Sequence, residues 1–402
     1  MTERLYYDDP YQREFDATVV SVEAHAAAEN GAALRAVRLD RTSFYPTTGG
    51  QPFDTGMLGL SRVVDVIDDE SGDVVHVVDG HVPQVGDAVR GVVDWPRRFD
   101  HMQQHTGQHV LSAAFVRRFG VKTVSFHLGA DVSTIDLARE VTAKEIAAAE
   151  DEANRVVWED RPVTIRYATA EEAAALPLRK EPVRTGTLRL IDVEGFDLSA
   201  CGGTHVSRTG AIGLIAVTAW ERFKGGHRLE FACGGRVLAR FRTLRDVTSA
   251  AVRALSVLPT DVASGIERLQ AELKEQKRVL TDAHATLARY QARELADAAE
   301  QHSWGRLVLQ AVDGDAARLK SLATAITANP GFLAVLLSTS SPSLVVAARS
   351  ADVIVACNDI VGSLAKRFGG RGGGKPDLAQ GGGLNAPVED ILTAARQLIQ
   401  KS

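Results

Sequence analysis

Two short segments far apart in the chain carry side chains that could bind one metal ion. HTGQH places His105 and His109 four residues apart, and CGGTH places Cys201 and His205 at the same spacing. On a helix, residues i and i+4 lie on one face, so both imidazoles of the first segment can reach one ion. The glycines of the second segment let a loop fold back, so that a sulfur and a nitrogen can join them. Three imidazoles and one thiolate suit tetrahedral zinc, and we hypothesise a hydrolytic Zn²⁺ centre.

His101 is the rival ligand, because it precedes His105 by four residues on the same expected helix. An isolated histidine on such a face is more often structural or solvated, and we interpret His101 in that way. Each pair of ligands is weak evidence alone, whereas two pairs in one domain-sized stretch favour a real metal site. Four protein ligands close a structural site and a catalytic site keeps a position for water or substrate, so both kinds of site stay open.

The elements that must position these ligands begin with β structure. Residues 1–95 contain short β-branched runs separated by Gly, Asp and Pro turns, which predicts a small barrel or sandwich. Pro96 breaks this pattern. Asp100 can then cap a helix that carries the histidines and runs to about Phe119, with Gly120 as its stop.

The residues that follow read as an α+β domain up to about residue 240. A helix is expected over 143–158, and strands over 188–193 and 212–217 flank the CGGTH segment. The apolar strand HRLEFAC contains Cys233, which we expect in the core and not on the metal.

Two further segments carry polar side chains that could line a pocket. The loop SFYPTTGGQPFDTG, residues 43–56, reads about equally well as a wide hairpin turn or as a substrate-facing loop. The strand TVSFHL places three polar residues on one face by its period of two, which indicates either solvent or a pocket. The polar side chains are Thr47, Thr48 and Gln51 on the loop, and Thr123, Ser125 and His127 on the strand.

Residues 241–300 carry Glu, Lys, Gln and Arg around regularly spaced apolar residues, which predicts one long amphipathic helix. Ile266, Leu269 and Leu273 begin an approximate a/d repeat that continues to Tyr290. Such a helix can pair within the chain or with a second copy, so a homodimer through the C-terminal half is one of two expectations.

Residues 301–402 return to α/β character, with buried-looking strands such as FLAVLLSTS, SLVVAARS and DVIVACND. The strongest composition bias lies in FGGRGGGKPDLAQGGG, residues 368–383, where glycines leave backbone N–H groups exposed beside cationic side chains. Such a cluster can hold phosphates, and a flexible surface loop is the alternative. The cations are Lys366, Arg367, Arg371 and Lys375.

The bulk composition is that of a folded protein with several domains. The chain has 402 residues, too many for one core, and its 45% hydrophobic and 24% charged content is ordinary for a soluble protein. A net charge of −5 means that any nucleic-acid contact must come from local basic patches. Three cysteines form no disulfide framework, and neither a signal peptide nor a membrane-spanning run is present. We therefore expect a cytoplasmic protein without membrane contact.

The motif QHTGQHVLSAAF followed by SACGGTHVSRTGAIG resembles the editing domain shared by alanyl-tRNA synthetases and the free-standing alanyl-tRNA editing proteins. SFYPTTGGQPFDTG is similar to the glycine-containing motif that precedes this domain, and KGGHRLEFACGG to the strand that follows it. FGGRGGGKPDLAQGGG resembles the signature of the DHHA1 domain. The resemblance covers nearly the whole chain. No class II aminoacylation domain precedes the β-rich region, so we expect the large, free-standing form of the AlaX family.

The resemblance implies an α+β multidomain fold of four parts. These are a β-barrel domain at 1–95, a zinc-binding editing domain at 96–240, a helical or coiled-coil linker at 241–300, and a DHHA1-like α/β domain at 301–402.

The resemblance also implies a site and a reaction. The family hydrolyses the ester that joins a wrong amino acid, chiefly serine, to alanine-specific tRNA, and the DHHA1-like domain is implicated in tRNA binding. A pocket built for alanine excludes an analogue that only adds a hydroxyl by just about 10²-fold, so editing has a physical purpose. The family's zinc ligands match His105, His109, Cys201 and His205, and Gly49, Gly50 and Gln51 match loop elements near its pocket.

Two other functions stay open alongside an aminoacyl-tRNA deacylase. One is a non-catalytic tRNA- or nucleic-acid-binding protein with a structural zinc. The other is a deacylase of a different mischarged tRNA. No side chain stands out as a general base.

Overall fold

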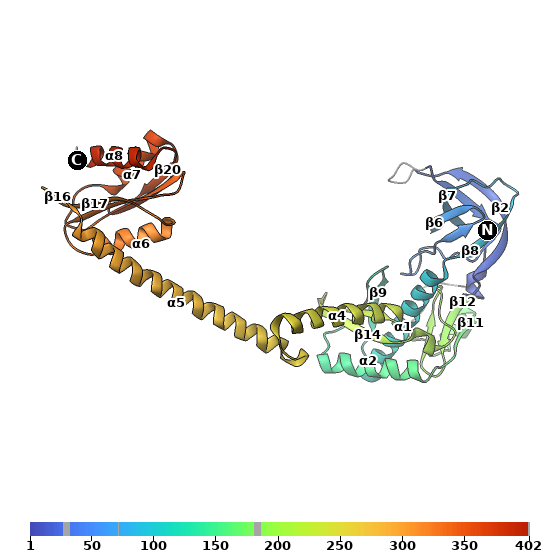
Figure 1. The fold of residues 1–402 in the computed structure, drawn as a ribbon. Coiled ribbons are helices and arrows are strands. Elements are labelled where there is room, and N and C mark those ends of the chain that lie inside the picture. The colour runs from blue at the N-terminus through green and yellow to red at the C-terminus, as the bar shows by residue number, and fades with distance from the viewer. Residues whose placement is uncertain (27–32, 71, 181–185, 401–402) are drawn as a thin grey trace. The chain divides into compact units, whose positions relative to one another are not determined.

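The computed structural model describes residues 1–26, 33–70, 72–180 and 186–400, which fold into two units (Figure 1). The first unit is Met1–Ala250 and the second is Ala251–Ser402. Within the described ranges, none of the helices combines the length and apolarity needed to cross a membrane.

Six strands of the first unit close into a barrel in the order β2-β3-β7-β6-β5-β8, which confirms the predicted barrel. Along β2, buried and exposed residues alternate, because successive side chains of a strand point in turn to the barrel core and to solvent. At Gly91 on β8, a Cβ would lie 2.3 Å from the Phe15 ring, so only glycine fits against this core side chain. The strands are β2 (Glu14–Ala24), β3 (Arg35–Leu39), β5 (Gly56–Leu58), β6 (Ser61–Asp68), β7 (Val74–Gly80) and β8 (Ala88–Val93), while β1 (Glu3–Arg4) pairs with β4 (Arg41–Thr42) outside the barrel.

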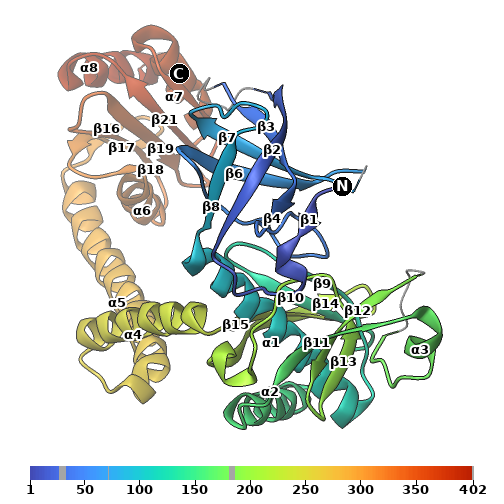
Figure 2. The same ribbon diagram turned by 90° about the vertical axis from the view of Figure 1, so that its right-hand side faces the viewer.

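Helix α1 (Trp95–Phe119) leaves the last barrel strand and runs into the α+β part of the first unit (Figure 2). The start expected at Asp100 is wrong, since Asp94 is the cap and its side chain accepts from the Arg97 N–H. Pro96 lies in the first turn, where its missing N–H costs nothing because that group has no helical partner. The expected stop at Gly120 is confirmed, with this glycine in the left-handed conformation.

The α+β part contains two antiparallel sheets around α1. One has the strand order β14-β15-β10-β9 and the other β11-β12-β13. The expected strand at 212–217 starts later, at Ile215, because residues 209–212 form a 3-10 turn. The elements are β9 (Thr123–Leu128), β10 (Ser133–Leu137), α2 (Ala143–Trp158), β11 (Val163–Ala168), α3 (Ala170–Ala174), β12 (Leu188–Val193), β13 (Asp197–Ala200), β14 (Ile215–Phe223) and β15 (Gly226–Cys233).

The single long helix expected over 241–300 is wrong. Two helices form instead, α4 (Gly235–Leu255) and α5 (Val262–Asp297), and a short 3-10 turn at Pro259–Asp261 precedes α5. Pro259 explains the break, because it lacks an N–H and would clash with the preceding turn of a continuous helix.

The second unit is a six-stranded mixed sheet with helices on both faces. Its order is β16-β17-β18-β19-β21-β20, and every residue of β18 is buried, as expected for a strand covered on both sides. The end of α5 packs with α6 over one core, and α7 with α8 over the other. The elements are β16 (Glu300–His302), β17 (Gly305–Val312), α6 (Ala316–Thr327), β18 (Phe332–Ser338), β19 (Ser343–Arg349), α7 (Cys357–Phe368), β20 (Arg371–Gly374), β21 (Leu378–Leu384) and α8 (Val388–Ile399).

Two expectations for this unit need correction. DVIVACND is not a strand, since residues 353–356 are irregular and α7 begins at Cys357. The glycine-rich segment contains a β-hairpin, β20–β21, and not only a loop. A Cβ at Gly372 would lie 2.5 Å from the side chain of Val361 on α7, so glycine lets the helix pack directly against the strand.

Candidate metal centre and its pocket

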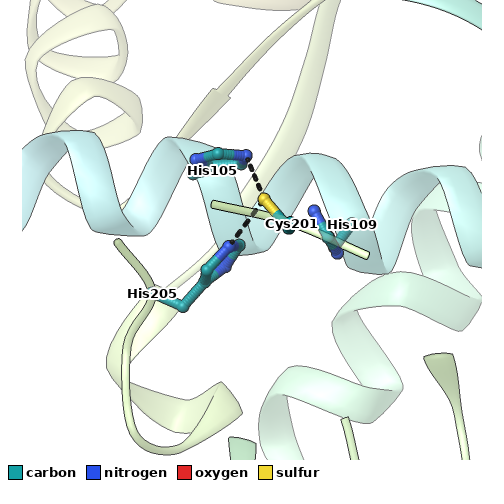
Figure 3. A group of neighbouring side chains, drawn as sticks. All are labelled: His105, His109, Cys201 and His205. Carbon is teal, nitrogen blue, oxygen red and sulfur yellow. Dashed lines mark hydrogen bonds between the residues drawn. The ribbon is translucent and has the colours of Figure 1, made fainter. Parts of the chain in front are cut away.

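The four predicted ligands converge in the first unit (Figure 3). One nitrogen from each of His105, His109 and His205 and the Sγ of Cys201 all lie within 4.8 Å of one another. The Cys201 Sγ lies 3.3 Å from Nε2 of His105 and 3.4 Å from Nε2 of His205. Ligand atoms around a tetrahedral zinc are roughly 3.3–3.6 Å apart, so the donor set and the two distances from the thiol sulfur fit a zinc ion.

Local geometry brings these ligands together. His105 and His109 lie one turn apart on α1, while Cys201 and His205 lie on the loop after β13. A Cβ at Gly203 would lie 2.1 Å from the His105 ring, so this glycine lets the loop approach the helix. The Arg189 guanidinium donates to the carbonyls of Cys201 and Gly203 at 2.8 and 2.9 Å, which fixes the loop.

Two imidazoles have their ring protons fixed by outer partners. Nδ1 of His105 lies 2.8 Å from Oε1 of Gln51, which also accepts from the backbone N–H of Thr204. Nδ1 of His205 lies 3.2 Å from the Thr106 hydroxyl, whose own proton goes to a backbone carbonyl. Both outer atoms act as acceptors, so each Nδ1 carries the proton and each Nε2 is left with a lone pair for a metal.

His109 is oriented by a carboxylate. Its Nδ1 donates to Oδ2 of Asp197 at 3.1 Å, and Asp197 is in turn held by Arg179 at 2.6 Å and by the Ser199 hydroxyl at 3.0 Å. Burial alone would raise the pKa of Asp197, but His109 and Arg179 lower it to about 2. The carboxylate therefore stays charged and holds the ring in place.

The electrostatics of the cluster favour a thiolate. Burial alone would raise the pKa of the Cys201 thiol, but the His105 and His205 imidazoles beside it lower this pKa well below its usual range. Burial lowers the pKa of His205 to about 3, so its imidazole is neutral. Burial alone would lower the pKa of His109, but its hydrogen bonds to Asp197 and Cys201 raise it. Zinc binds a thiolate and neutral imidazoles, so a metal ion would displace any proton that His109 holds.

The rival His101 is buried on α1 but lies outside this group. Its Nδ1 has no hydrogen-bond partner among the described residues. Cys233 is fully buried in the core of the first unit, as expected.

A cavity of about 520 Å³ opens beside the cluster and is lined by His109 and Cys201. This volume lies within the range of pockets that bind small molecules. Of the predicted pocket residues, those that line it are Thr48, Gly49, Thr123 and Ser125.

The remaining predicted pocket residues lie elsewhere. Thr47, Gly50 and His127 are exposed and do not line the cavity. Gln51 is buried behind His105 and also donates to the hydroxyl of Thr204 at 2.8 Å, so it supports a ligand and does not face the cavity.

Several neighbours of the cluster escape the motifs. Asp197 and Arg179 carry no periodic signal, whereas Thr106 and Gln108 lie inside HTGQH itself, between the ligands. Gln108 lines the cavity, and its Oε1 is buried without a partner among the described residues. Of these neighbours, only Thr106 and Gln108 could thus have been found from the sequence, because they are polar residues within a ligand motif.

The predicted tRNA-contacting cations lie in the second unit. Lys366 and Arg367 end α7, Arg371 begins β20, and Lys375 follows that strand. All four side chains are exposed.

Sequence models of three families match the chain. They are "tRNA synthetases class II (A)" over residues 1–97, "Threonyl and Alanyl tRNA synthetase second additional domain" over 188–230, and "DHHA1 domain" over 305–401. The second match contains Cys201 and His205. A solved structure of the C-Ala domain of Aquifex aeolicus alanyl-tRNA synthetase matches 26% of this chain and 95% of its own, with 22% identity and a TM-score of 0.24.

Whole-chain relatives are of two kinds. Alanine–tRNA ligases of Methanoregula boonei and Halorubrum lacusprofundi are 34% and 37% identical over 99% of this chain. The chain spans less than half of these ligases, 43% and 44% of their lengths. The alanyl-tRNA editing protein AlaX-L of Pyrococcus horikoshii is 30% identical over the whole chain and 99% of its own length.

Proposed function

Because the chain belongs to the family of AlaX-L alanyl-tRNA editing proteins, we propose that it deacylates mischarged alanine-specific tRNA, chiefly seryl-tRNA(Ala), in the cytoplasm. The observation that carries this proposal is the His105–His109–Cys201–His205 cluster at the wall of a cavity of about 520 Å³. A zinc ion in that cluster supplies a Lewis acid for ester hydrolysis.

The cavity wall offers hydrogen-bonding groups for a seryl side chain. The Thr123 hydroxyl donates to Ser112 at 2.8 Å and the Ser125 hydroxyl donates to Asp136 at 2.5 Å, so both oxygens keep lone pairs for a donor. Thr48 extends this set, as does Oε1 of Gln108, which has no hydrogen-bond partner in the described part of the chain. A site that hydrogen-bonds a substrate hydroxyl rejects the analogue without it by about 10⁴-fold, which is the discrimination that serine removal needs. We assign the general base to no side chain.

Transfer RNA is the proposed partner. The exposed cations Lys366, Arg367, Arg371 and Lys375 lie on or next to a hairpin of bare glycine backbone, which suits contacts to phosphates. Neutralising all four is expected to weaken tRNA binding and to reduce its salt dependence.

A homodimer is proposed through α5, where Leu269, Leu273 and Leu280 are about 60% exposed. Sedimentation of the full chain tests this proposal.

A panel of aminoacyl-tRNAs tests the reaction. Zinc-loaded protein is expected to release serine from seryl-tRNA(Ala) and little alanine from alanyl-tRNA(Ala), and Cys201→Ala is expected to abolish release. Cys357→Ala, in the core of the second unit, is the matched control. Retained activity in a zinc-free Cys201→Ala protein would refute the zinc mechanism.

The four-ligand set also favours a second candidate, a structural zinc in a non-catalytic tRNA-binding protein. In that case tRNA binds without deacylation, and chelation unfolds the first unit. Release of a different amino acid in the panel would instead identify a deacylase of another mischarged tRNA.

A further inference from the structure

Phe126 forms an apolar part of the cavity wall next to the metal cluster. Its ring centroid lies 5.9 Å from that of His105, with the two planes inclined by 44°. The residue is half-buried and lines the same cavity as Cys201 and His109. A bulky ring therefore stands where the acyl group of a substrate would approach the ligands.

The loop of residues 43–56, here called the glycine loop, contacts this ring on one side. A Cβ on Gly50 would lie 2.8 Å from Cε2 of Phe126, so the ring already rests on bare backbone. Gly50 has a φ of +81°, which favours glycine, and its carbonyl accepts from the Leu128 N–H at 3.1 Å. The ring has no space to withdraw toward the loop.

The strand that carries Phe126 is fixed on its other side. β9 pairs with β10, where Phe126 lies opposite the fully buried Ile135. Ser125 is bonded to Asp136, and Asp136 is ion-paired with Arg228 at 2.7 Å. Because both sides are anchored, the wall keeps its position when a ligand enters.

We propose that Phe126 is a specificity-determining residue that limits the size of the amino-acid side chain admitted beside the metal cluster. The inference rests on the proposed deacylase function and names its substrate class: acyl groups with small side chains. Serine fits because its hydroxyl reaches the Thr123 and Ser125 oxygens without displacing the ring. A branched side chain such as that of leucine would meet the ring, whose retreat toward the loop is blocked by Gly50.

Binding of stable substrate analogues tests this size limit. The probes are 3′-amino-3′-deoxyadenosine acylated with serine or with leucine, whose amide bond resists hydrolysis. Zinc-loaded wild-type protein is expected to bind the seryl probe at least about 10-fold more tightly than the leucyl probe. Phe126→Ala is expected to remove that preference by strengthening leucyl binding about 10-fold, with unchanged zinc content. His127→Ala, the exposed next residue, is the matched control and keeps the wild-type ratio.

The outcomes separate the size limit from the reaction itself. Equal binding of both probes by the wild type, or an unchanged ratio in Phe126→Ala, overturns the size limit even if seryl-tRNA(Ala) is hydrolysed. Absence of any hydrolysis together with the expected binding ratios overturns the deacylase function and leaves the size limit standing. If Phe126→Ala folds poorly, Phe126→Leu serves as a second variant. Its ratio of seryl to leucyl binding is expected to lie between those of the wild type and Phe126→Ala.

Discussion

Asp197 accepts a hydrogen bond from Nδ1 of His109 on Oδ2 at 3.1 Å, while Nε of Arg179 donates to its other oxygen, Oδ1, at 2.6 Å. The carboxylate is buried and charged, and it fixes which ring nitrogen of His109 faces the other ligands. One residue outside the ligand set thus controls a ligand's orientation.

Replacing this carboxylate should weaken metal binding without removing a ligand. Asp197→Ala is expected to lower zinc affinity by about 10- to 100-fold, because His109 loses the partner that sets its tautomer. Competition with a chelator of known affinity measures the change. Asp192→Ala is the control, since Asp192 pairs with the exposed Arg166 on the neighbouring strand. Equal affinity in the two variants would contradict the role of Asp197.

His101 should be dispensable for the metal. His101→Gln is expected to keep one zinc per folded chain, because this side chain lies outside the cluster, whereas His105→Gln is expected to lose most of it. Elemental analysis of the monodisperse folded protein gives the stoichiometry. A zinc-free His101→Gln protein would restore the rival ligand set.

A buried ion pair joins the glycine loop to the start of α1, and breaking it should destabilise the first unit. Arg98 donates from Nε to Oδ2 of Asp54 at 2.9 Å, and both side chains are fully buried. Arg98→Met leaves an uncompensated buried carboxylate, so the free energy of unfolding is expected to fall by about 3–5 kcal/mol. Denaturant unfolding of the full chain measures it. Arg97→Met is the control, and the double variant Asp54→Asn/Arg98→Met should recover part of the loss.

Acid should destabilise the barrel through His76. This fully buried ring bonds to the Thr42 hydroxyl at 2.8 Å and to the Val37 carbonyl at 3.1 Å, and burial lowers its pKa from 6.5 to about 4. The unfolded chain therefore binds more protons between pH 6.5 and 4, so stability is present above pH 6.5 and falls as pH drops through this window. The loss amounts to on the order of 3 kcal/mol. In His76→Gln the free energy of unfolding is expected to fall less steeply as the pH drops from 6.5 to 4. An identical dependence on pH in the variant and the wild type would contradict the role given to His76.

Two candidate ligand pairs could be recognised from sequence because their geometry is local, but spacing alone left His101 as a rival, and the family resemblance favoured His105 and His109. Two histidines a helical turn apart and a thiol beside two glycines specify directions within five residues. Their supports could not be predicted in this way, because each is a long-range pair. Gln51 reaches His105 across 54 residues and Asp197 reaches His109 across 88. No periodic pattern encodes such a contact.

Fold predictions were correct where a clear pattern of apolar residues marked a strand. They were wrong where a proline or glycine is compatible with two different local structures. The barrel strands and β18 were recognisable from apolar patterning. Pro96 is compatible with a helical first turn, whereas Pro259 lies at a break between helices. The bare strand β20 was unrecognised, because glycine there serves the packing of Val361 and not chain flexibility.

The separation of the two ligand pairs has a consequence for biosynthesis. His105 precedes Cys201 by 96 residues, and ribosomes add about 5–20 residues per second, so the helix histidines are synthesised roughly 5–20 s before the thiol. During that interval the nascent chain contains only two of the four candidate ligands. The four candidate ligands can therefore come together only after translation has passed His205.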